Sequence, residues 1–175
     1  MKNIILISIL IIGNIIFCQE TFSEKILIEK SNQIIEKYSE RILTSEKKDT
    51  TYGSNFLVMT RYFDKEKKLV KRININPRSS LGFTGPRTEI YEANGRMIVA
   101  KNEDSSGRIW YLSINEYDNS GNLVKQTMFD MKFINTKLYE YDSDNELLKV
   151  SFYNNKGRKV NSEKRTKRKK QYSLN

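Results

Sequence analysis

Tyr117-Asp118-Asn119-Ser120-Gly121-Asn122-Leu123 is the most informative segment for the fold, because it places the residue types of a tight turn between an aromatic and an aliphatic residue. An aspartate at the first turn position caps a type I turn with its side chain. A glycine three residues later takes the left-handed conformation that closes a hairpin with a bulge. The stretch therefore predicts two antiparallel strands that meet at this turn.

Related stretches recur along the chain and make the turn the unit of a repeat. Copies begin at Tyr91, Glu103, Tyr141 and Tyr153, with a weaker copy at Phe63 and one at Phe129 that lacks the glycine. From residue 91 onward the copies start 12, 14, 12, 12 and 12 residues apart. Asn145 suits the left-handed position, whereas Lys67 and Phe133 are poor residues for it. The spacing predicts a mainly β fold, an antiparallel meander of about eight strands in a single twisted sheet.

Alternation along the predicted strands indicates one apolar face and one tyrosine-rich face. The apolar face is expected to carry Trp110, Leu112, Ile114, Leu148, Val150 and Phe152. The candidate binding residues are the tyrosines of the sheet, Tyr111, Tyr117, Tyr139, Tyr141 and Tyr153. Such rings either stabilise the sheet as a cross-strand ladder or contact a sugar or a protein partner, and the sequence leaves both readings open.

A helix is predicted over residues 22–45, to be packed on the apolar face of the sheet. Thr21 and Glu24 match a capping box. Apolar residues then recur at helical spacing at Leu27, Ile34, Ile35, Tyr38 and Ile42. The expected parts of the chain are a leader (1–19), a helix with its connector (20–53), the hairpin repeat (54–161) and a tail (162–175). Residues 76–87 are expected to form the longest irregular loop.

Residues 1–19 have the three parts of a secretory signal peptide. Lys2 supplies the positive charge, an apolar run extends from Ile4 to Phe17, and Cys18 is a small residue at the expected cleavage point. The apolar run is about fourteen residues, short of the roughly 20 that a membrane-spanning helix needs. We expect export to the periplasm or the outside, with no transmembrane segment in the mature chain. An uncleaved anchor and a lipid on Cys18 are the alternatives.

The positive charge of the chain is concentrated near its end. The formal net charge is +10, but nine basic residues and one acidic residue lie between Lys156 and Lys170 and carry +8 of it, which leaves +2 for the rest. We expect a flexible basic tail that could contact an anionic envelope surface. Nucleic acid is not an expected partner, because export removes it and the aromatic residues lie elsewhere.

The residue types that the chain contains, and their positions, do not favour a catalytic site or a cofactor site. Histidine is absent, which removes the commonest general base near neutral pH and the commonest zinc ligand. The carboxylates Asp104, Asp118, Asp130 and Asp142 lie at turn positions, where capping explains them better than acid–base catalysis. Residues 142–146 alternate oxygen ligands but lack the glycine and the bidentate glutamate of a calcium loop. We expect no enzyme activity, no metal and no cofactor.

The Tyr-Asp-x-x-Gly-x-Leu pattern at Tyr117–Leu123 resembles the YD repeats of RHS-type bacterial surface proteins. It is also similar to the hairpin repeats of MORN-like, YwqK-type antitoxin-component proteins. The resemblance covers about residues 63–160. The chain is far too short to enclose a cargo as RHS shells do, and it lacks the regular Gly-rich strand motif of MORN proteins. The resemblance implies a repeat sheet used for contact or scaffolding and transfers no catalytic residue.

These observations favour an exported, non-enzymatic binding or scaffolding protein of the bacterial envelope or extracellular space. Its expected partner is an unidentified protein or glycan that contacts the repeat sheet. One alternative is an immunity or antitoxin-like protein that occludes a toxin. The other is a polysaccharide-acting enzyme that uses two carboxylates.

Overall fold

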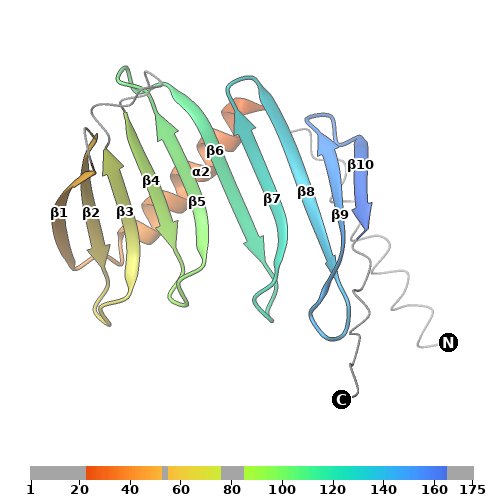
Figure 1. Cartoon of the computed structure of the whole chain (residues 1–175), viewed down its shortest axis with the longest axis horizontal. Helices are drawn as coiled ribbons and strands as arrows, with labels where there is room; N and C mark the ends of the chain where they lie inside the picture. Colours follow the sequence, from red (N-terminus) through yellow and green to blue (C-terminus); the bar gives the residue numbers. More distant parts are fainter. Residues whose placement is uncertain (1–22, 53–54, 76–84, 165–175) are drawn as a thin grey trace, which may run out of the picture.

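The computed structural model describes residues 23–52, 55–75 and 85–164. Within these residues, ten antiparallel strands form one open sheet whose strand order is the chain order, and one helix lies beside it (Figure 1). The predicted meander with a helix is therefore confirmed, with ten strands in place of about eight. The leader, the tail beyond Lys164 and residues 76–84 of the predicted loop lie outside the described residues.

The helix is α2 (Glu24–Ser39). The strands are β1 (Thr44–Tyr52), β2 (Asn55–Phe63), β3 (Leu69–Ile75), β4 (Pro86–Tyr91), β5 (Met97–Glu103), β6 (Ile109–Tyr117), β7 (Leu123–Asp130), β8 (Phe133–Tyr141), β9 (Leu147–Asn154) and β10 (Lys159–Lys164). Ser23 caps α2, since its hydroxyl accepts a hydrogen bond from the N–H of Ile26 at 3.3 Å. No described helix has the length and apolar character that crossing a bilayer requires.

The segment between helix and sheet differs from the prediction. The helix ends at Ser39 instead of residue 45, and β1 occupies most of the predicted connector. Every residue of β1 pairs with β2, from Thr44 opposite Phe63 to Tyr52 opposite Asn55. Because β1 is an edge strand with a polar sequence, it has no apolar alternation by which a strand is recognised.

The predicted turn chemistry is confirmed in six hairpins. Asp64, Asp104, Asp142 and Asn154 each accept two backbone N–H groups on Oδ1, at 2.9–3.0 Å. The left-handed position three residues later is occupied by Lys67, Gly95, Gly107, Gly121, Asn145 and Gly157, with φ between 60° and 95°. Lys67 therefore adopts the left-handed conformation although it is a poor residue for it.

The hairpin at Phe129 does not follow the repeat. Met131 and Lys132 alone link β7 to β8, and Met131 has the positive φ of 51°. Phe133 is the first residue of β8 and not a turn residue. The prediction of a seventh copy is wrong here, because without a glycine or asparagine at that position the chain forms the shorter two-residue link.

Lys67 and Gly95 give opposite expectations for stability. Lys67→Gly is expected to raise the free energy of unfolding by about 0.5 kcal/mol, because relief of the left-handed strain exceeds the added chain entropy. Gly95→Ala is expected to lower it by about 1 kcal/mol, and since a Cβ there meets nothing within 4 Å, the loss reports backbone strain alone. Urea unfolding of both variants checks this, and effects of the same sign would contradict it.

Each of the six turns is followed by a β-bulge in the second strand. The pairing register skips one residue there, at Val70, Ile98, Trp110, Val124, Leu148 and Val160. In two of the bulges that residue, Val70 or Ile98, is buried. The same local unit, turn plus bulge, is thus repeated at both ends of the strands.

The ends of the strands determine which face each unit presents. Four of the turns lie at the lower end of the sheet in Figure 1, and those that link β5 to β6 and β9 to β10 lie at the upper end. Each hairpin has a fixed handedness. In a meander that continues in one direction, it can occur at the other end of the strands only if it is turned over about an axis that lies in the sheet and crosses the strands. That rotation exchanges the two faces of the hairpin. The first residue of the motif therefore points to one face at Tyr117 and Tyr141, and to the other face at Tyr153.

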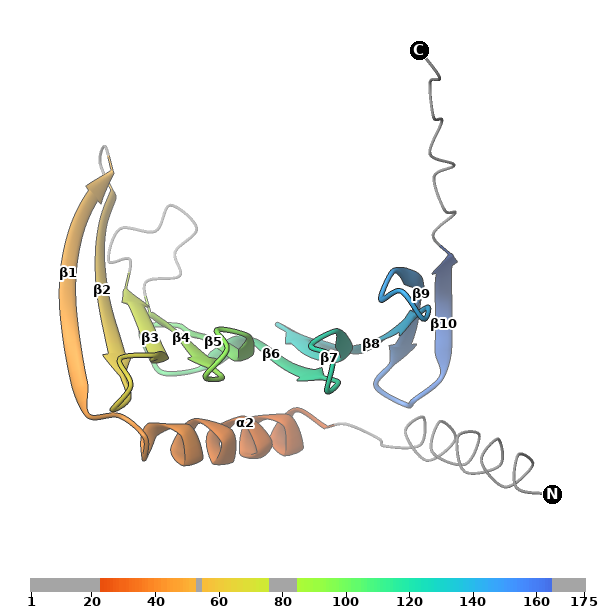
Figure 2. The same cartoon turned by 90° about the horizontal axis from the view of Figure 1, so that it is seen from below.

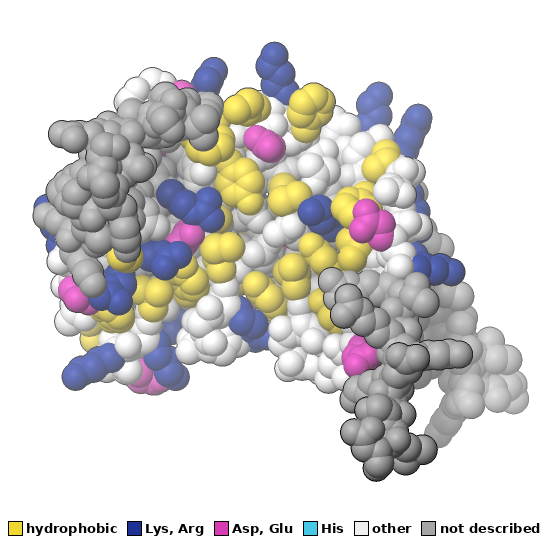
Figure 3. Space-filling model, viewed as in Figure 1, with side chains coloured by type: hydrophobic (Ala, Val, Ile, Leu, Met, Phe, Trp, Pro, Cys, Tyr) yellow, Lys and Arg dark blue, Asp and Glu magenta, His cyan; other side chains and the backbone are white. Residues whose placement is uncertain are grey.

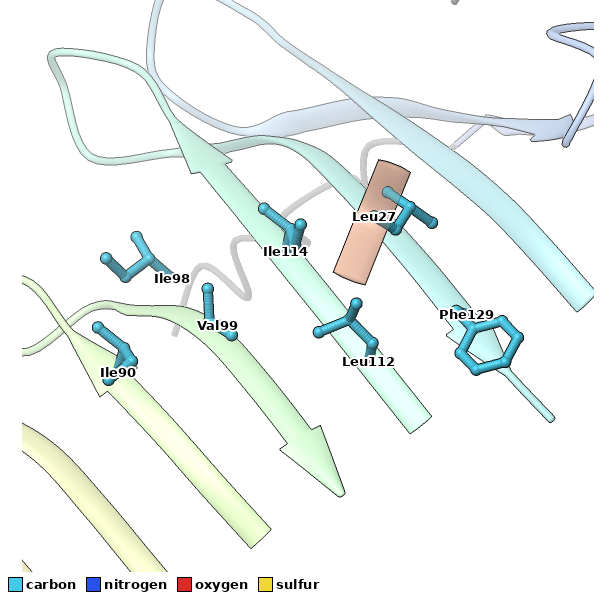
Figure 4. Close-up of a cluster of buried hydrophobic side chains, with 7 residues drawn as sticks. All are labelled: Leu27, Ile90, Ile98, Val99, Leu112, Ile114 and Phe129. Carbon is cyan, nitrogen blue, oxygen red and sulfur yellow. The ribbon is translucent and has the colours of Figure 1, made fainter. Parts of the chain in front are cut away.

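The core lies between α2 and one face of the sheet. Leu27 of the helix packs with buried side chains from β4 to β7 (Figure 4), namely Ile90, Ile98, Val99, Leu112, Ile114 and Phe129. Lys30 reaches the sheet as well, with its Nζ 3.1 Å from Glu116 Oε1. The sheet is curved, with α2 on its convex side, while β1 and β2 on one flank and β9 and β10 on the other bend away from the helix (Figure 2). We call the concave side the open face.

The prediction of a continuous apolar face is wrong for the later strands. Ile114 faces α2, and its cross-strand neighbours Thr127, Thr136 and Tyr153 follow on the same side. Val150 pairs with Tyr139 and so lies on the open face, as does Phe152. The reason is the face exchange, since β6 follows a turn at the upper end of the strands and β9 follows one at the lower end.

Candidate functional site

The open face is the candidate site, because no described element covers it and the curvature makes it a trough that runs along the strands (Figure 2). Figure 3 shows this face, where hydrophobic side chains, a class that there includes tyrosine, lie across the middle with basic and acidic side chains among them. The structure places four of the five predicted tyrosines here, Tyr111, Tyr117, Tyr139 and Tyr141. Tyr153 lies on the face that α2 covers in part, so its grouping with the others was wrong.

Two of these tyrosines have a structural task. Tyr117 donates its hydroxyl to the carbonyl oxygen of Met97 at 3.0 Å, and Tyr141 donates to that of Leu123 at 3.0 Å. Each bond joins one lower-end hairpin to the preceding one. Burial raises the pKa of both hydroxyls, and Asp118 adds to the effect at Tyr141. Arg96 also stacks on the ring of Tyr117, 5.0 Å from its centroid. These two residues act as cross-strand locks.

Tyr111 and Tyr139 have weaker ties to the sheet. The hydroxyl of Tyr139 lies 3.5 Å from Gln126 Oε1, at the limit of a hydrogen bond. Burial raises the pKa of Tyr139, with a smaller contribution from Tyr141. The ring of Tyr111 is approached by the guanidinium of Arg87 at 5.9 Å. Both rings are half-buried, so part of each remains accessible to a partner.

A buried carboxylate lies at the β3–β4 side of the trough. Glu89 Oε2 accepts from Arg72 Nε at 2.5 Å and from the hydroxyl of Tyr91 at 2.9 Å, and Oε1 accepts from Arg87 Nε at 2.7 Å. The Glu89 side chain is 4% exposed, whereas those of Arg72 and Arg87 are 35% and 38% exposed. Solvent therefore meets the guanidinium groups, while the carboxylate that orients them is shielded.

Charge and burial act in opposite directions on this cluster. Burial raises the pKa of the Glu89 carboxyl, but hydrogen bonds from Arg87, Tyr91 and Arg72 together outweigh it and lower the pKa below its usual value. The same cluster raises the pKa of the Tyr91 hydroxyl to about 12, chiefly through burial and then through its bond to Glu89. Glu89 is therefore ionised at neutral pH and holds both arginines in place.

Two further cations lie on the same face. Arg61 is the direct cross-strand partner of Arg72, and its Nη2 lies 2.9 Å from Glu46 Oε2 of the edge strand. Its Nε is buried and has no hydrogen-bond partner among the described residues. Lys137 on β8 lies over the ring of Phe152, with Nζ 5.6 Å from the centroid. Sequence reasoning missed these residues, because only the pairing register brings them to one face.

Side-chain amides fill the floor of the trough between the three arginines and Lys137. Asn115 Oδ1 accepts from Gln126 Nε2 at 3.0 Å and from Ser113 Oγ at 3.2 Å, and Asn115 Nδ2 donates to the carbonyl of Met97 at 2.9 Å. Asn102 accepts from Arg87 Nη1 at 3.1 Å. The floor thus combines amides, hydroxyls and half-buried rings.

The turn carboxylates have the structural role predicted for them where the structure describes their bonds. In Asp104 and Asp142, Oδ1 is occupied by two backbone N–H groups of the same turn. Hydrogen bonds from Ser106 lower the pKa of Asp104, although burial opposes them. Among the described residues, no three carboxylate, cysteine or histidine side chains are grouped as metal ligands.

Comparison with other proteins gives no family for the chain. No protein-family model matches it, and no curated protein matches it either. The resemblance to YD and MORN-like repeats therefore stays a prediction.

Proposed function

We propose that the protein is an exported, non-enzymatic binding or scaffolding protein of the bacterial envelope or its surroundings, which holds a partner on the open face. The observation that carries the proposal is the asymmetry of the sheet. One face is closed by α2 over β3, β5 and β6. The other is concave and free of any described element, and it presents half-buried rings, amides and guanidinium groups.

The tyrosines of the open face differ in role, and some support stabilisation of the sheet while others support contact with a partner. Tyr117 and Tyr141 stabilise the sheet, since both hydroxyls are bonded to backbone carbonyls. Tyr111 and Tyr139 are the better candidates for contact, because their rings line the trough without such a bond to the backbone among the hydrogen bonds described for them. Both rings are half-buried, so neighbouring side chains already limit their rotation and they lose less entropy on binding than exposed rings would.

A double variant tests this division. Tyr111→Ala with Tyr139→Ala is expected to reduce the retention of a specific partner from envelope extract on the immobilised mature chain at least tenfold, because each ring removes more than about 1 kcal/mol of contact. The matched control is Tyr153→Ala, a tyrosine of the other face, which should retain the partner. Circular dichroism verifies that all variants fold.

The same experiment separates the sheet from the tail. A chain that ends at Lys164 keeps β10 intact, because the strand extends to that residue and past the predicted boundary at 162. We expect it to retain the partner. Loss of the partner on truncation, with retention by the double tyrosine variant, would move the binding function from the open face to the basic tail.

A further inference from the structure

We infer that the open face binds an acidic polysaccharide, with Arg61, Arg72, Arg87 and Lys137 as the groups that contact its carboxylates. This inference rests on the proposed function and specifies the partner. Between β2 and β9 the open face carries these four cations. The carboxylates on this face are the buried Glu89, Asp130 at the end of β7, and Glu46 and Glu163 on the two edge strands, β1 and β10. Between the edge strands a partner meets exposed guanidinium groups, because Glu89, which holds two of them, is shielded from solvent.

The arginines keep donors for a ligand while they are held in place. Arg72 uses Nε and Nη2 on Glu89, and Arg87 uses Nε on Glu89 and Nη1 on Asn102. A guanidinium has five N–H donors, so each retains N–H groups beyond those bonds. Tyr91 and Tyr111 further restrict the two guanidiniums, which lie 5.7 and 5.9 Å from the ring centroids. Such fixed guanidiniums match carboxylates in a bidentate manner.

Arg61 adds an unsatisfied donor to this group. It lies directly opposite Arg72 on the neighbouring strand, where the ion pairs with Glu46 and Glu89 offset the repulsion between the two guanidiniums. Its Nε has no hydrogen-bond partner among the described residues. An anion between Arg61 and Arg72 would accept hydrogen bonds from the N–H groups that their pairs with Glu46 and Glu89 leave unused. Lys137 provides a second contact across the trough, on β8.

The rest of the trough suits a sugar chain. No described element crosses the trough, which runs along the strands, so a polymer longer than the strands can lie in it (Figure 2). Half-buried rings such as Tyr111 and Tyr139 can stack on the apolar faces of sugar rings. The amide of Gln126 and its neighbours can exchange hydrogen bonds with hydroxyl groups. Rings, amides and guanidiniums together match a chain of uronic acid sugars.

The test uses polygalacturonate as the probe, dextran as the neutral control and poly-glutamate as the acidic peptide control. Affinity electrophoresis of the full mature chain is expected to show retardation by polygalacturonate and none by dextran. Arg61→Gln with Lys137→Gln is expected to weaken binding at least tenfold, because two charge-assisted contacts are removed. Neither change strips Glu89 of a partner, and both side chains are partly exposed, so folding is retained.

The control variant removes the same charge elsewhere. Lys25→Gln with Lys149→Gln deletes one lysine on α2 and one on the other face of β9, and binding should change less than twofold. An equal loss in both variants would mean that net charge alone attracts the probe and would overturn the inference. Poly-glutamate bound as tightly, with the same dependence on Arg61 and Lys137, would replace the polysaccharide with an acidic peptide. In either case, the proposed function is still supported if the variant with Tyr111→Ala and Tyr139→Ala loses the partner retained from envelope extract.

Discussion

Replacing Leu27 by alanine is expected to lower the free energy of unfolding by about 3 kcal/mol, the largest effect of a single substitution proposed for this chain. Leu27 is 1% exposed and is the fully buried apolar residue by which α2 enters the core. Its removal leaves a cavity between the helix and the convex face, where the strands of a hydrogen-bonded sheet have little freedom to close it.

The neighbouring residue supplies the control. Ile26 is 49% exposed, so Ile26→Ala removes a similar volume at the adjacent position and should change stability by less than about 0.5 kcal/mol. Urea unfolding followed by circular dichroism measures both. Similar losses in the two variants would show that helix propensity, and not the docking of α2 on the sheet, determines the contribution of this segment.

Replacing Glu89 by glutamine is expected to cost about 2 to 3 kcal/mol at pH 7, because two arginines lose the charge that orients them. The value lies below that of a fully buried ion pair, since water can still reach Arg72 and Arg87. Glu46→Gln is the control. It breaks the exposed pair with Arg61 and should cost less than about 1 kcal/mol.

The pH dependence of this difference has a definite sign. The pKa of Glu89 is lowered in the folded protein, so its charge stabilises the fold fully above the pKa of an unfolded glutamate, about 4.3. The stabilisation is lost as the pH falls through the lower pKa of the folded state. The gap between wild type and Glu89→Gln should therefore shrink between pH 5 and the acid limit of folding. A gap that stays constant over that range would exclude the ionised carboxylate as its source.

The elements set by local chemistry are those that the sequence predicted. The Asp-x-x-Gly turns require only residues within one turn, and so Asp104 and Gly107 identify their hairpin without knowledge of the rest of the fold. The same local chemistry explains the left-handed conformation of Lys67, because Asp64 accepts hydrogen bonds from the N–H groups of Glu66 and Lys68 and so closes the turn around Lys67. The edge strand β1 was missed, since backbone pairing with β2 and not side-chain burial determines it.

The candidate site was predicted in part. Its tyrosines are visible in the sequence, but which of them are locks depends on carbonyl groups of another hairpin, as at Tyr117 and Met97. Glu89 lies in the short strand Pro86–Tyr91, where nothing local marks it as buried. Its burial follows from the register that sets it opposite Arg72. The placement of Tyr153 could have been derived by counting hairpins, because each change of end changes the face.

That exchange of faces makes a pair of hairpins, and not one, the unit by which such an array can grow. Tyr117 and Tyr141 are 24 residues apart and do the same work, whereas Tyr153, only 12 residues further, is on the opposite side. Duplication of a single twelve-residue segment would move every later side chain to the opposite face of the sheet. Duplication of two segments together would widen the trough by two strands and keep the later side chains on the faces they now occupy.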